Sequence, residues 1–268
     1  MITERIYLRE GDDTIYLDAL IAQPTPKYTR RAILVIPGGA YQEVCAGHEG
    51  EPIGLAFMAH GYNAFVLHYS VARVRPFPAQ LIEASLAVKH IKDNAERYGI
   101  DPEEIFVTGF SAGGHLACSL GLLWHLPEIY EAIDMPYGYN RVRGMMLGYP
   151  VITSNGRTHV ATHRNLWCTD TPTDDQLAMS SLEKHVDERS APLFLMHTSN
   201  DLAVPVHNAL CLGEAYAEAG IPFEMHIYPK GPHGVALGND ITSRGIAECS
   251  EAAIGKWVEQ AAYWAEHL

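Results

Sequence analysis

Hydrophobic and polar positions along the chain follow two patterns that alternate. Short runs of β-branched and other apolar residues are separated by stretches in which apolar residues recur at helical spacing. This alternation is typical of parallel βαβ units, and it predicts an α/β fold with a mostly parallel, doubly wound sheet flanked by helices. The predicted strands span residues 6–8, 15–22, 32–36, 63–68, 105–108, 144–149, 192–197 and 223–227.

The helical stretches end at residues that commonly stop helices. Two predicted helices span about residues 52–60 and 79–98, and Gly61 and Gly99 follow them as C-terminal stops. A third predicted helix covers about residues 247–266, where apolar positions again recur on one face.

Residues 150–190 interrupt the alternation of strands and helices. This segment is long, polar and poor in periodicity. Long loops in compact domains are usually functional, so we expect it to form a small cap over an active site. A surface excursion without a role is the alternative. No internal repeat divides the chain, and we expect residues 1–268 to form a single α/β domain.

One serine lies in a GxSxG box between a predicted strand and a helical stretch, in the sequence IFVTGFSAGGHLA. This order is the sequence form of a nucleophile elbow, a sharp strand-to-helix turn that exposes a serine hydroxyl above the sheet. Gly109 and Gly113 leave room for a close approach of the backbone. Ser111 is therefore the candidate nucleophile. A glycine-rich helix start is the alternative interpretation of the box taken alone.

An aspartate and a histidine follow later predicted strands. Asp201 comes just after one apolar run, and His233 lies in a Gly/Pro loop after the last strand. The chain order Ser, Asp, His is that of α/β-hydrolases. We expect His233 to be the base and Asp201 to be the acid that orients it. The rival acids, which no apolar run precedes, are Asp174, Asp175 and Asp187.

A glycine pair, Gly38 and Gly39, follows the predicted strand 32–36. In α/β-hydrolases the loop at this place supplies backbone amides to the oxyanion hole. Removing one such donor typically raises the barrier by about 2.7–4 kcal/mol. A plain tight turn is the alternative. The candidate donors are the amides of Gly39, Ala40 and Ala112.

Six longer motifs are spread over nearly the whole chain. They are PGGAY, HEGEP, GYNAFVLHY, GIDPEEIFVTGFSAGGHLA, HTSNDLAVPVHN and HIYPKGPHG. Together they resemble the small α/β-hydrolase esterases known as acetyl xylan or bifunctional acetyl/feruloyl esterases. The resemblance implies hydrolysis of carboxylic esters without a cofactor, and it places the catalytic triad on Ser111, Asp201 and His233. Pro37 and Ala40 depart from the HGGG pattern of wider lipases and esterases, which leaves the second oxyanion donor open.

Composition narrows the class of protein further. Of the 268 residues, 47% are hydrophobic, so the chain can bury a sizeable core. The formal net charge of −13 disfavours nucleic acids and anionic membranes as partners, and no apolar run is long enough to span a bilayer. We therefore expect a neutral small molecule, an acyl ester, as the substrate.

The cysteines and the N-terminal residues indicate in which cellular compartment we expect the protein. The five cysteines are scattered and lack CxxC spacing, and the N-terminus, MITERIYLREGDD, has no apolar segment of a signal peptide. These features predict reduced thiols in a cytoplasmic protein, without a disulfide framework or a zinc site.

Several further residues are candidates for the site. Tyr41 lies beside the oxyanion loop, and Trp167 in the expected cap is suited to stacking on a sugar ring, with ordinary packing as its alternative. His48 and Glu49 either line the entrance or begin a helix. A metal site would need a third ligand, which does not accompany the i, i+4 pair His159 and His163, so we predict no metal there. The resemblance implies that no cofactor is needed.

These observations predict a serine carboxylesterase that hydrolyses short acyl esters, in particular acetyl groups on carbohydrates such as xylo-oligosaccharides. A serine peptidase or amidase is the alternative, because the same triad serves both reactions. A noncatalytic ligand-binding protein with a hydrolase fold is a third hypothesis. The sequence does not indicate the oligomeric state.

Overall fold

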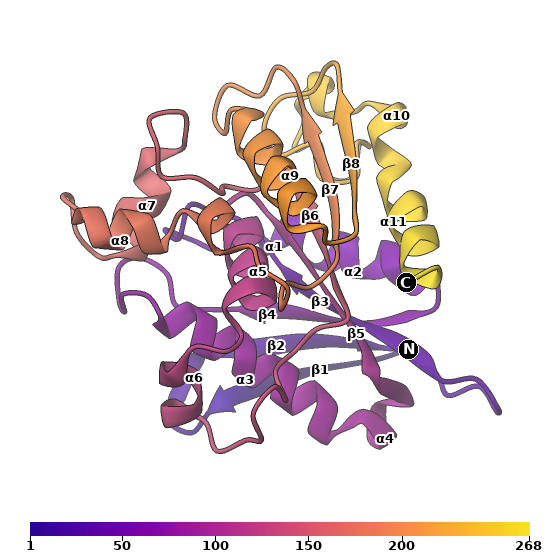
Figure 1. The fold of residues 1–268 in the computed structure, drawn as a ribbon. Helices are drawn as coiled ribbons and strands as arrows, with labels where there is room; N and C mark the ends of the chain where they lie inside the picture. The colour runs from indigo at the N-terminus through magenta and orange to yellow at the C-terminus, as the bar shows by residue number, and fades with distance from the viewer.

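The fold is built on one eight-stranded sheet, described by a computed structural model of residues 1–268 (Figure 1). The strand order is β1-β2-β4-β3-β5-β6-β7-β8. Strand β2 pairs antiparallel with β1 on one side and with β4 on the other, and all other neighbours are parallel. The strands are β1 Ile2–Arg9, β2 Asp12–Ile21, β3 Arg30–Ile36, β4 Tyr62–His68, β5 Ile100–Phe110, β6 Gly144–Gly148, β7 Leu193–Thr198 and β8 Phe223–Tyr228.

Helices cover both faces of the sheet. Alternation along β3 sends Leu34 and Ile36 into the larger hydrophobic cluster, and Ile33 and Val35 into a second one. The larger cluster lies under α3, α5 and α9, and the second lies under α2 and α11. The α-helices are α1 Ala46–Glu49, α2 Glu51–Met58, α3 Ala79–Asp93, α4 Ala95–Tyr98, α5 Ser111–Leu123, α6 Pro127–Ala132, α7 Val160–Leu166, α8 Asp174–Met179, α9 His207–Ala219, α10 Ala252–Gly255 and α11 Trp257–Glu266.

The predicted α/β-hydrolase fold class is confirmed, and all eight predicted strands are present with somewhat different bounds. Two predicted helices are divided. The helix predicted over 79–98 breaks at Asn94, whose backbone leaves the helical region and whose side chain donates to the carbonyl of His90.

The helix predicted over 247–266 is also broken. It consists of a 3-10 turn, Ala247–Cys249, followed by α10 and α11. Gly255 ends α10 against the carbonyl of Leu237, where a Cβ would come within 2.7 Å of that oxygen. This close backbone approach separates the two helices.

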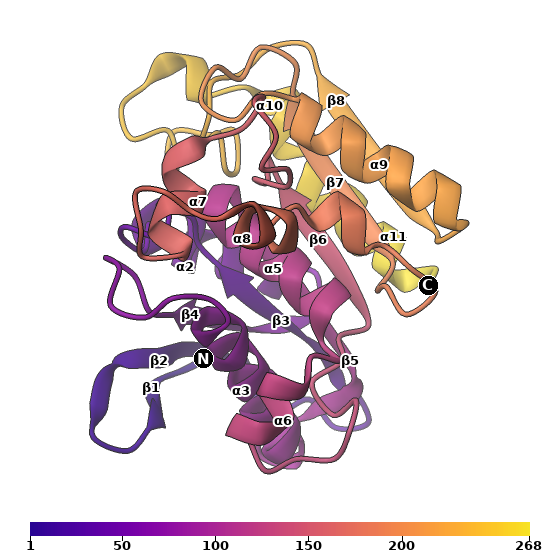
Figure 2. The same ribbon diagram turned by 60° about the vertical axis from the view of Figure 1, so that its left-hand side comes forward.

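The segment 150–190 contains α7, α8 and the 3-10 turn Leu182–His185. Figure 2 shows α7 and α8 on the side of the sheet that α5 covers. The Val151 amide donates to the carbonyl of Ser111, and the Phe77 amide donates to that of Leu166. Backbone hydrogen bonds therefore tie the segment to its surroundings at its start and in its middle.

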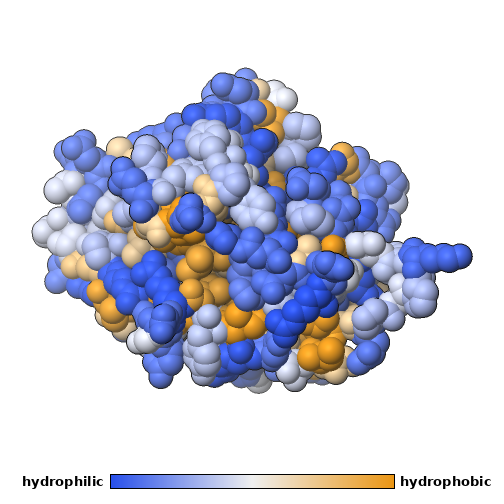
Figure 3. Space-filling model, turned by 90° about the horizontal axis from the view of Figure 1, so that it is seen from below, coloured by the Kyte–Doolittle hydropathy of each residue, from blue (hydrophilic) through white to orange (hydrophobic).

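The surface seen from below is mostly hydrophilic, with apolar residues gathered in small patches (Figure 3). None of the helices is long and apolar enough to cross a bilayer. All five cysteines are free thiols, two of them buried.

Candidate active site

The serine of the GxSxG box lies at the junction between β5 and α5. Ser111 has a φ of +54°, a left-handed conformation that L-residues seldom adopt and that places the residue on a sharp corner. The corner fits only because Gly113 lacks a side chain: a Cβ there would lie 2.2 Å from the carbonyl oxygen of Ile36. The local structure is therefore the predicted elbow.

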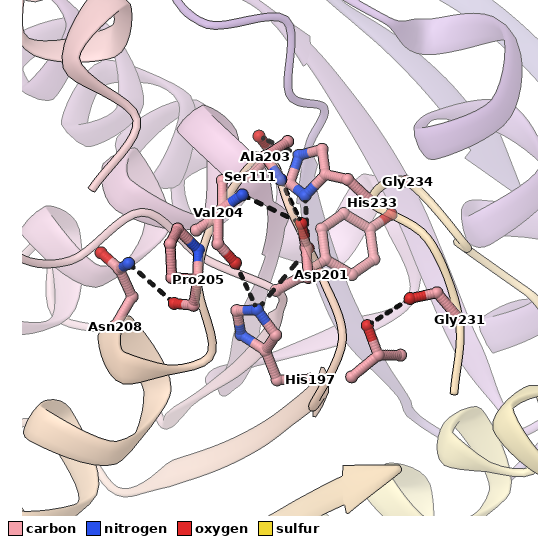
Figure 4. Close-up of polar contacts among 12 residues, drawn as sticks. Ser111, His197, Asp201, Ala203, Val204, Pro205, Asn208, Gly231, His233 and Gly234 are labelled. Carbon is pink, nitrogen blue, oxygen red and sulfur yellow. Dashed lines mark hydrogen bonds and ion pairs between the residues drawn. The ribbon is translucent and has the colours of Figure 1, made fainter. Parts of the chain in front are cut away.

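Ser111, His233 and Asp201 form a continuous hydrogen-bonded chain (Figure 4). The Ser111 Oγ lies 2.8 Å from Nε2 of His233, and Nδ1 of His233 lies 2.7 Å from Oδ2 of Asp201. With the proton on Nδ1, the imidazole donates to the carboxylate and accepts from the serine hydroxyl. This arrangement has the geometry that nucleophilic acyl transfer requires.

Asp201 is held by its own loop after β7. Its Oδ1 accepts the amides of Ala203 and Val204, both at 2.9 Å, and Oδ2 lies 3.6 Å from Nε2 of His197. Burial favours a higher pKa for Asp201, but the nearby His197 and the hydrogen bond from His233 outweigh it and lower the pKa. The carboxylate is therefore ionised at neutral pH.

The rival acids lie elsewhere. Asp174 and Asp175 occupy the first turn of α8, and Asp187 pairs with Arg189. None of the three lines the cleft around Ser111. Only Asp201 is brought to the histidine.

The loop after β3 turns through three consecutive residues of positive φ: +124° at Gly39, +55° at Ala40 and +56° at Tyr41. The amides of Gly39 and Ala40 make no hydrogen bond within the chain, whereas the Gly38 amide donates to Glu49. Ala112 is in the first turn of α5, where backbone amides have no intrahelical acceptor. The three predicted donors are therefore free to bind an oxyanion, and Gly38 is not.

Gly39, Ala40, Ser111 and His233 line a cleft of about 280 Å³. Most of the residues that line it have polar side chains, and the three hydrophobic ones, Ala40, Cys45 and Ala203, are small. Sequence reasoning pointed to His48 and Glu49 at the entrance but missed the other polar side chains of the cleft. The polar side chains around Ser111 and His233 are Gln42, Glu43, His48, Glu49, His159 and Arg244.

The structure places neither of the two predicted aromatic substrate contacts in the cleft. Tyr41 is 1% exposed, because its backbone turns the ring into the core, where the hydroxyl lies 3.0 Å from Nδ1 of His115. Trp167 packs edge-on against Phe77 at a centroid distance of 5.4 Å and does not line the cleft. Both residues pack against the core, which is the alternative stated for Trp167.

His159 and His163 do not act as a pair. His159 precedes α7 and bonds Thr162, while buried His163 lies 3.0 Å from the carbonyl of Thr153 and 3.1 Å from Oγ of Ser180. Both ring nitrogens of His163 are thus engaged by the protein. His159 instead lines the cleft.

The chain has recognisable relatives. The profile of the BD-FAE family matches residues 17–216, about three quarters of the chain. The chain belongs to the BD-FAE family. It is a carboxylic ester hydrolase with the α/β-hydrolase fold, as its family and relatives show.

Three similar proteins bear on the substrate. Endo-1,4-beta-xylanase B of Butyrivibrio fibrisolvens is 38% identical over 79% of this chain and 33% of that protein. The acetylxylan esterase of Xylanibacter ruminicola is 27% identical over 78% of this chain and 42% of that protein. The chain therefore spans less than half the length of these two relatives.

The third is a solved structure that matches at full length. The crystal structure of an acetyl ester-xyloside bifunctional hydrolase from Caldicellulosiruptor lactoaceticus is 31% identical, with a TM-score of 0.84. The match covers 98% of this chain and 96% of that one.

Proposed function

We propose that this BD-FAE family esterase removes short acyl groups, above all acetyl, from carbohydrates such as xylo-oligosaccharides, through an acyl-enzyme on Ser111. The observation that carries the proposal is the hydrogen-bonded chain Ser111–His233–Asp201 beside free backbone amides. A nucleophile, a base, an orienting acid and oxyanion donors are the parts that ester hydrolysis requires.

In the first step His233 takes the Ser111 proton through Nε2 as Oγ attacks the ester carbonyl. Asp201 stabilises the imidazolium through Nδ1, and the amides of Gly39, Ala40 and Ala112 bind the oxyanion. The imidazolium then protonates the leaving alcohol as the carbon–oxygen bond breaks. His233 next deprotonates a water that attacks the acyl-enzyme, which releases the acid and restores Ser111.

The lining of the cleft supports a hydrophilic alcohol and a short acyl group. Charged and amide side chains around the mouth offer donors and acceptors that suit sugar hydroxyls. The cleft has a volume of about 280 Å³ and its hydrophobic residues are all small, so it offers a long acyl chain little surface to bury. The names of the relatives from Xylanibacter and Caldicellulosiruptor, which contain acetylxylan and acetyl ester-xyloside, agree with this substrate class.

The test is a series of p-nitrophenyl esters measured beside a panel of acetylated sugars. We expect kcat/KM to fall from acetate to butyrate to octanoate, with each unaccommodated extension costing about 1–3 kcal/mol, and acetate to be released from acetylated xylo-oligosaccharides. Preference for octanoate, or a rate jump above the critical micelle concentration, would indicate a lipase. Faster cleavage of an aminoacyl anilide than of acetate esters would indicate a peptidase or amidase.

A further inference from the structure

A buried carboxylate lies beside the cleft and takes no part in the mechanism described above. Glu49 ends α1 and is 3% exposed. Its Oε2 accepts the amide of Gly38 at 2.8 Å, and its Oε1 accepts the hydroxyl of Tyr149 at 2.8 Å. Burying a carboxylate is costly, so the two bonds that satisfy it show what the charge is used for.

The first bond fixes the oxyanion loop against the elbow. Gly38 immediately precedes Gly39, whose amide is a proposed oxyanion donor. A Cβ on Gly38 would lie 2.8 Å from the carbonyl of Phe110 and 2.9 Å from the Cβ of Ser111. The peptide that Glu49 holds is therefore packed directly on the nucleophile, and its position sets where the following amides point.

The second bond fixes the surroundings of the base. Tyr149 follows β6 with a φ of +35°, and its ring lies edge-on to His233 at a centroid distance of 5.0 Å. The Tyr149 hydroxyl also accepts the Ala236 amide at 3.1 Å, three residues beyond His233. Burial, followed by the Glu49 charge, raises the pKa of Tyr149 well above its ordinary value, so the hydroxyl keeps the proton that it donates.

No cation neutralises Glu49 at close range. The nearest basic side chain is His48, whose Nε2 lies 3.8 Å from Oε1. Burial lowers the pKa of His48, although Glu49 opposes this shift, so the imidazole is neutral at neutral pH. The carboxylate is thus stabilised mainly by the two donors from the oxyanion loop and from Tyr149.

We infer that Glu49 is a positioning residue: one carboxylate holds the oxyanion loop through Gly38 and the His233 loop through Tyr149, in register with Ser111. The inference rests on the proposed acyl-enzyme mechanism. It assigns Glu49 no contact with substrate and no proton transfer.

The geometry explains why glutamate is needed here. Both partners are donors, so a glutamine can accept from only one of them with its oxygen and turns its amino group toward the other. An aspartate keeps the charge but is one methylene shorter and cannot reach both. Because displacement of catalytic groups by about 1 Å can cost about 10²-fold in rate, either change should act on the chemical step.

The experiment compares Glu49→Gln, Glu49→Asp and Tyr149→Phe with two controls. Glu83→Gln alters another fully buried glutamate, which bonds Ser70 and does not line the cleft, and Tyr216→Phe removes a buried hydroxyl that donates to Ala191. Each variant is assayed with p-nitrophenyl acetate, and the inhibition constant of a short trifluoromethyl ketone, whose hemiketal mimics the tetrahedral intermediate, is measured. Thermal melting reports stability.

We expect Glu49→Gln and Glu49→Asp to lower kcat about 100-fold and Tyr149→Phe about tenfold, with KM changed less than about threefold. The ketone should bind more weakly by the factor by which kcat/KM falls, because both report stabilisation of the transition state. The controls should lower the melting temperature but leave kcat and ketone affinity within about twofold.

Three results would overturn the inference. The first is ketone affinity and kcat near wild type in Glu49→Gln or, if that variant does not fold, in Tyr149→Phe. The second is an equal loss of kcat in the controls. The third is full activity of Glu49→Asp, which would show that residue 49 contributes its charge and does not position the two loops. Failure of wild type itself to react with the ketone would instead count against the proposed function.

Discussion

Three histidines lie near the start of α5: His233 in the cleft, and His115 and His163 in the core. The cleft and the core differ in whether they stabilise a protonated imidazole. His233 has a side chain that is 25% exposed and a carboxylate at 2.7 Å, so the ring can gain a proton and have it stabilised. His115 and His163 are buried without a carboxylate partner. Burial lowers the pKa of His115 to about 3 and that of His163 to about 4.

His115 and His233 also differ in which ring nitrogen carries the proton. The Nε2 of His115 lies 3.1 Å from the carbonyl of Ser180, which can only accept, so Nε2 carries the proton. The Nδ1 is then left to accept from the Tyr41 hydroxyl. His115 is therefore a neutral structural link between the oxyanion loop, α5 and the segment 150–190. The burial of a histidine and its hydrogen-bond partners therefore decide whether it acts as a base or as a structural link.

The prediction with the largest expected effect tests whether Ser111 and His233, which line the cleft, perform the chemistry. Ser111→Ala should fold normally but lose about 10⁴–10⁶-fold in kcat, because the members of a triad act as a unit. Ser119→Ala, a buried serine on the same helix that bonds the carbonyl of His115, is the control. Retention of a tenth of wild-type turnover, or a fluorophosphonate adduct mapped to another residue, would remove Ser111 from the mechanism.

The next effect tests the carboxylate that distinguishes His233 from the buried histidines. Asp201→Asn places an amide beside Nδ1 and favours the wrong tautomer, so we expect kcat to fall about 10²–10⁴-fold on p-nitrophenyl acetate. Asp187→Asn, in an exposed pair with Arg189, should remain near wild type. The opposite pattern would show that the acid is misassigned.

The buried group should act on stability in acid. Both histidines have folded-state pKa values below the unfolded value of 6.5, so the unfolded chain takes up protons first as pH falls. Their contribution is complete above 6.5 and is lost as pH falls toward about 4 and about 3. For each histidine, the free energy of unfolding falls by about 1.4 kcal/mol for every pH unit that the pH drops within this range.

Urea unfolding between pH 7 and pH 4.5 measures this slope, and His163→Gln isolates one histidine. The variant should lose stability less steeply with falling pH, by about 1.4 kcal/mol per pH unit, while kcat at neutral pH stays within about threefold. Parallel curves for wild type and variant would contradict the assignment of His163 as a neutral buried group.

The smallest effect concerns the rim of the cleft. Arg244 is exposed at its mouth, and only long contacts of 3.4 and 3.5 Å join its guanidinium to the carbonyls of His233 and Gly234. Arg244→Gln should therefore lower kcat/KM on acetylated xylo-oligosaccharides about two- to tenfold, as loss of one hydrogen bond does. On p-nitrophenyl acetate it should stay near wild type. An equal loss on both esters would place Arg244 on the acyl side.

The triad and the strands could be predicted because each leaves a local trace. Ser111 lies in a box whose glycines the elbow needs, and Asp201 and His233 each follow an apolar run. Those runs are strands whose carboxyl ends meet at one edge of the parallel sheet, so residues distant in sequence converge there. Chain order and the preceding apolar runs together were enough to relate them.

The errors arose where side-chain direction decides the outcome. Position beside the oxyanion loop makes Tyr41 a candidate for the cleft, but three positive φ angles in succession turn its ring inward. The polar residue at the fifth place of the helix, His115, was the available signal, since it needs a buried partner. Arg244 gave no signal, because it lies in a stretch without periodicity that folds back over Gly234 only in three dimensions.

The hydrogen bond from Asn165 to the carbonyl of Ala40, at 2.9 Å, has a consequence for protein engineering. It couples α7 to the residues around the reacting carbonyl, so exchanging α7 for the matching segment of a relative would alter turnover along with specificity. The turn before α8 is different, since Thr171 is exposed and bonds only its neighbour Thr169. A tag, a fluorophore or a carbohydrate-binding module is best inserted there.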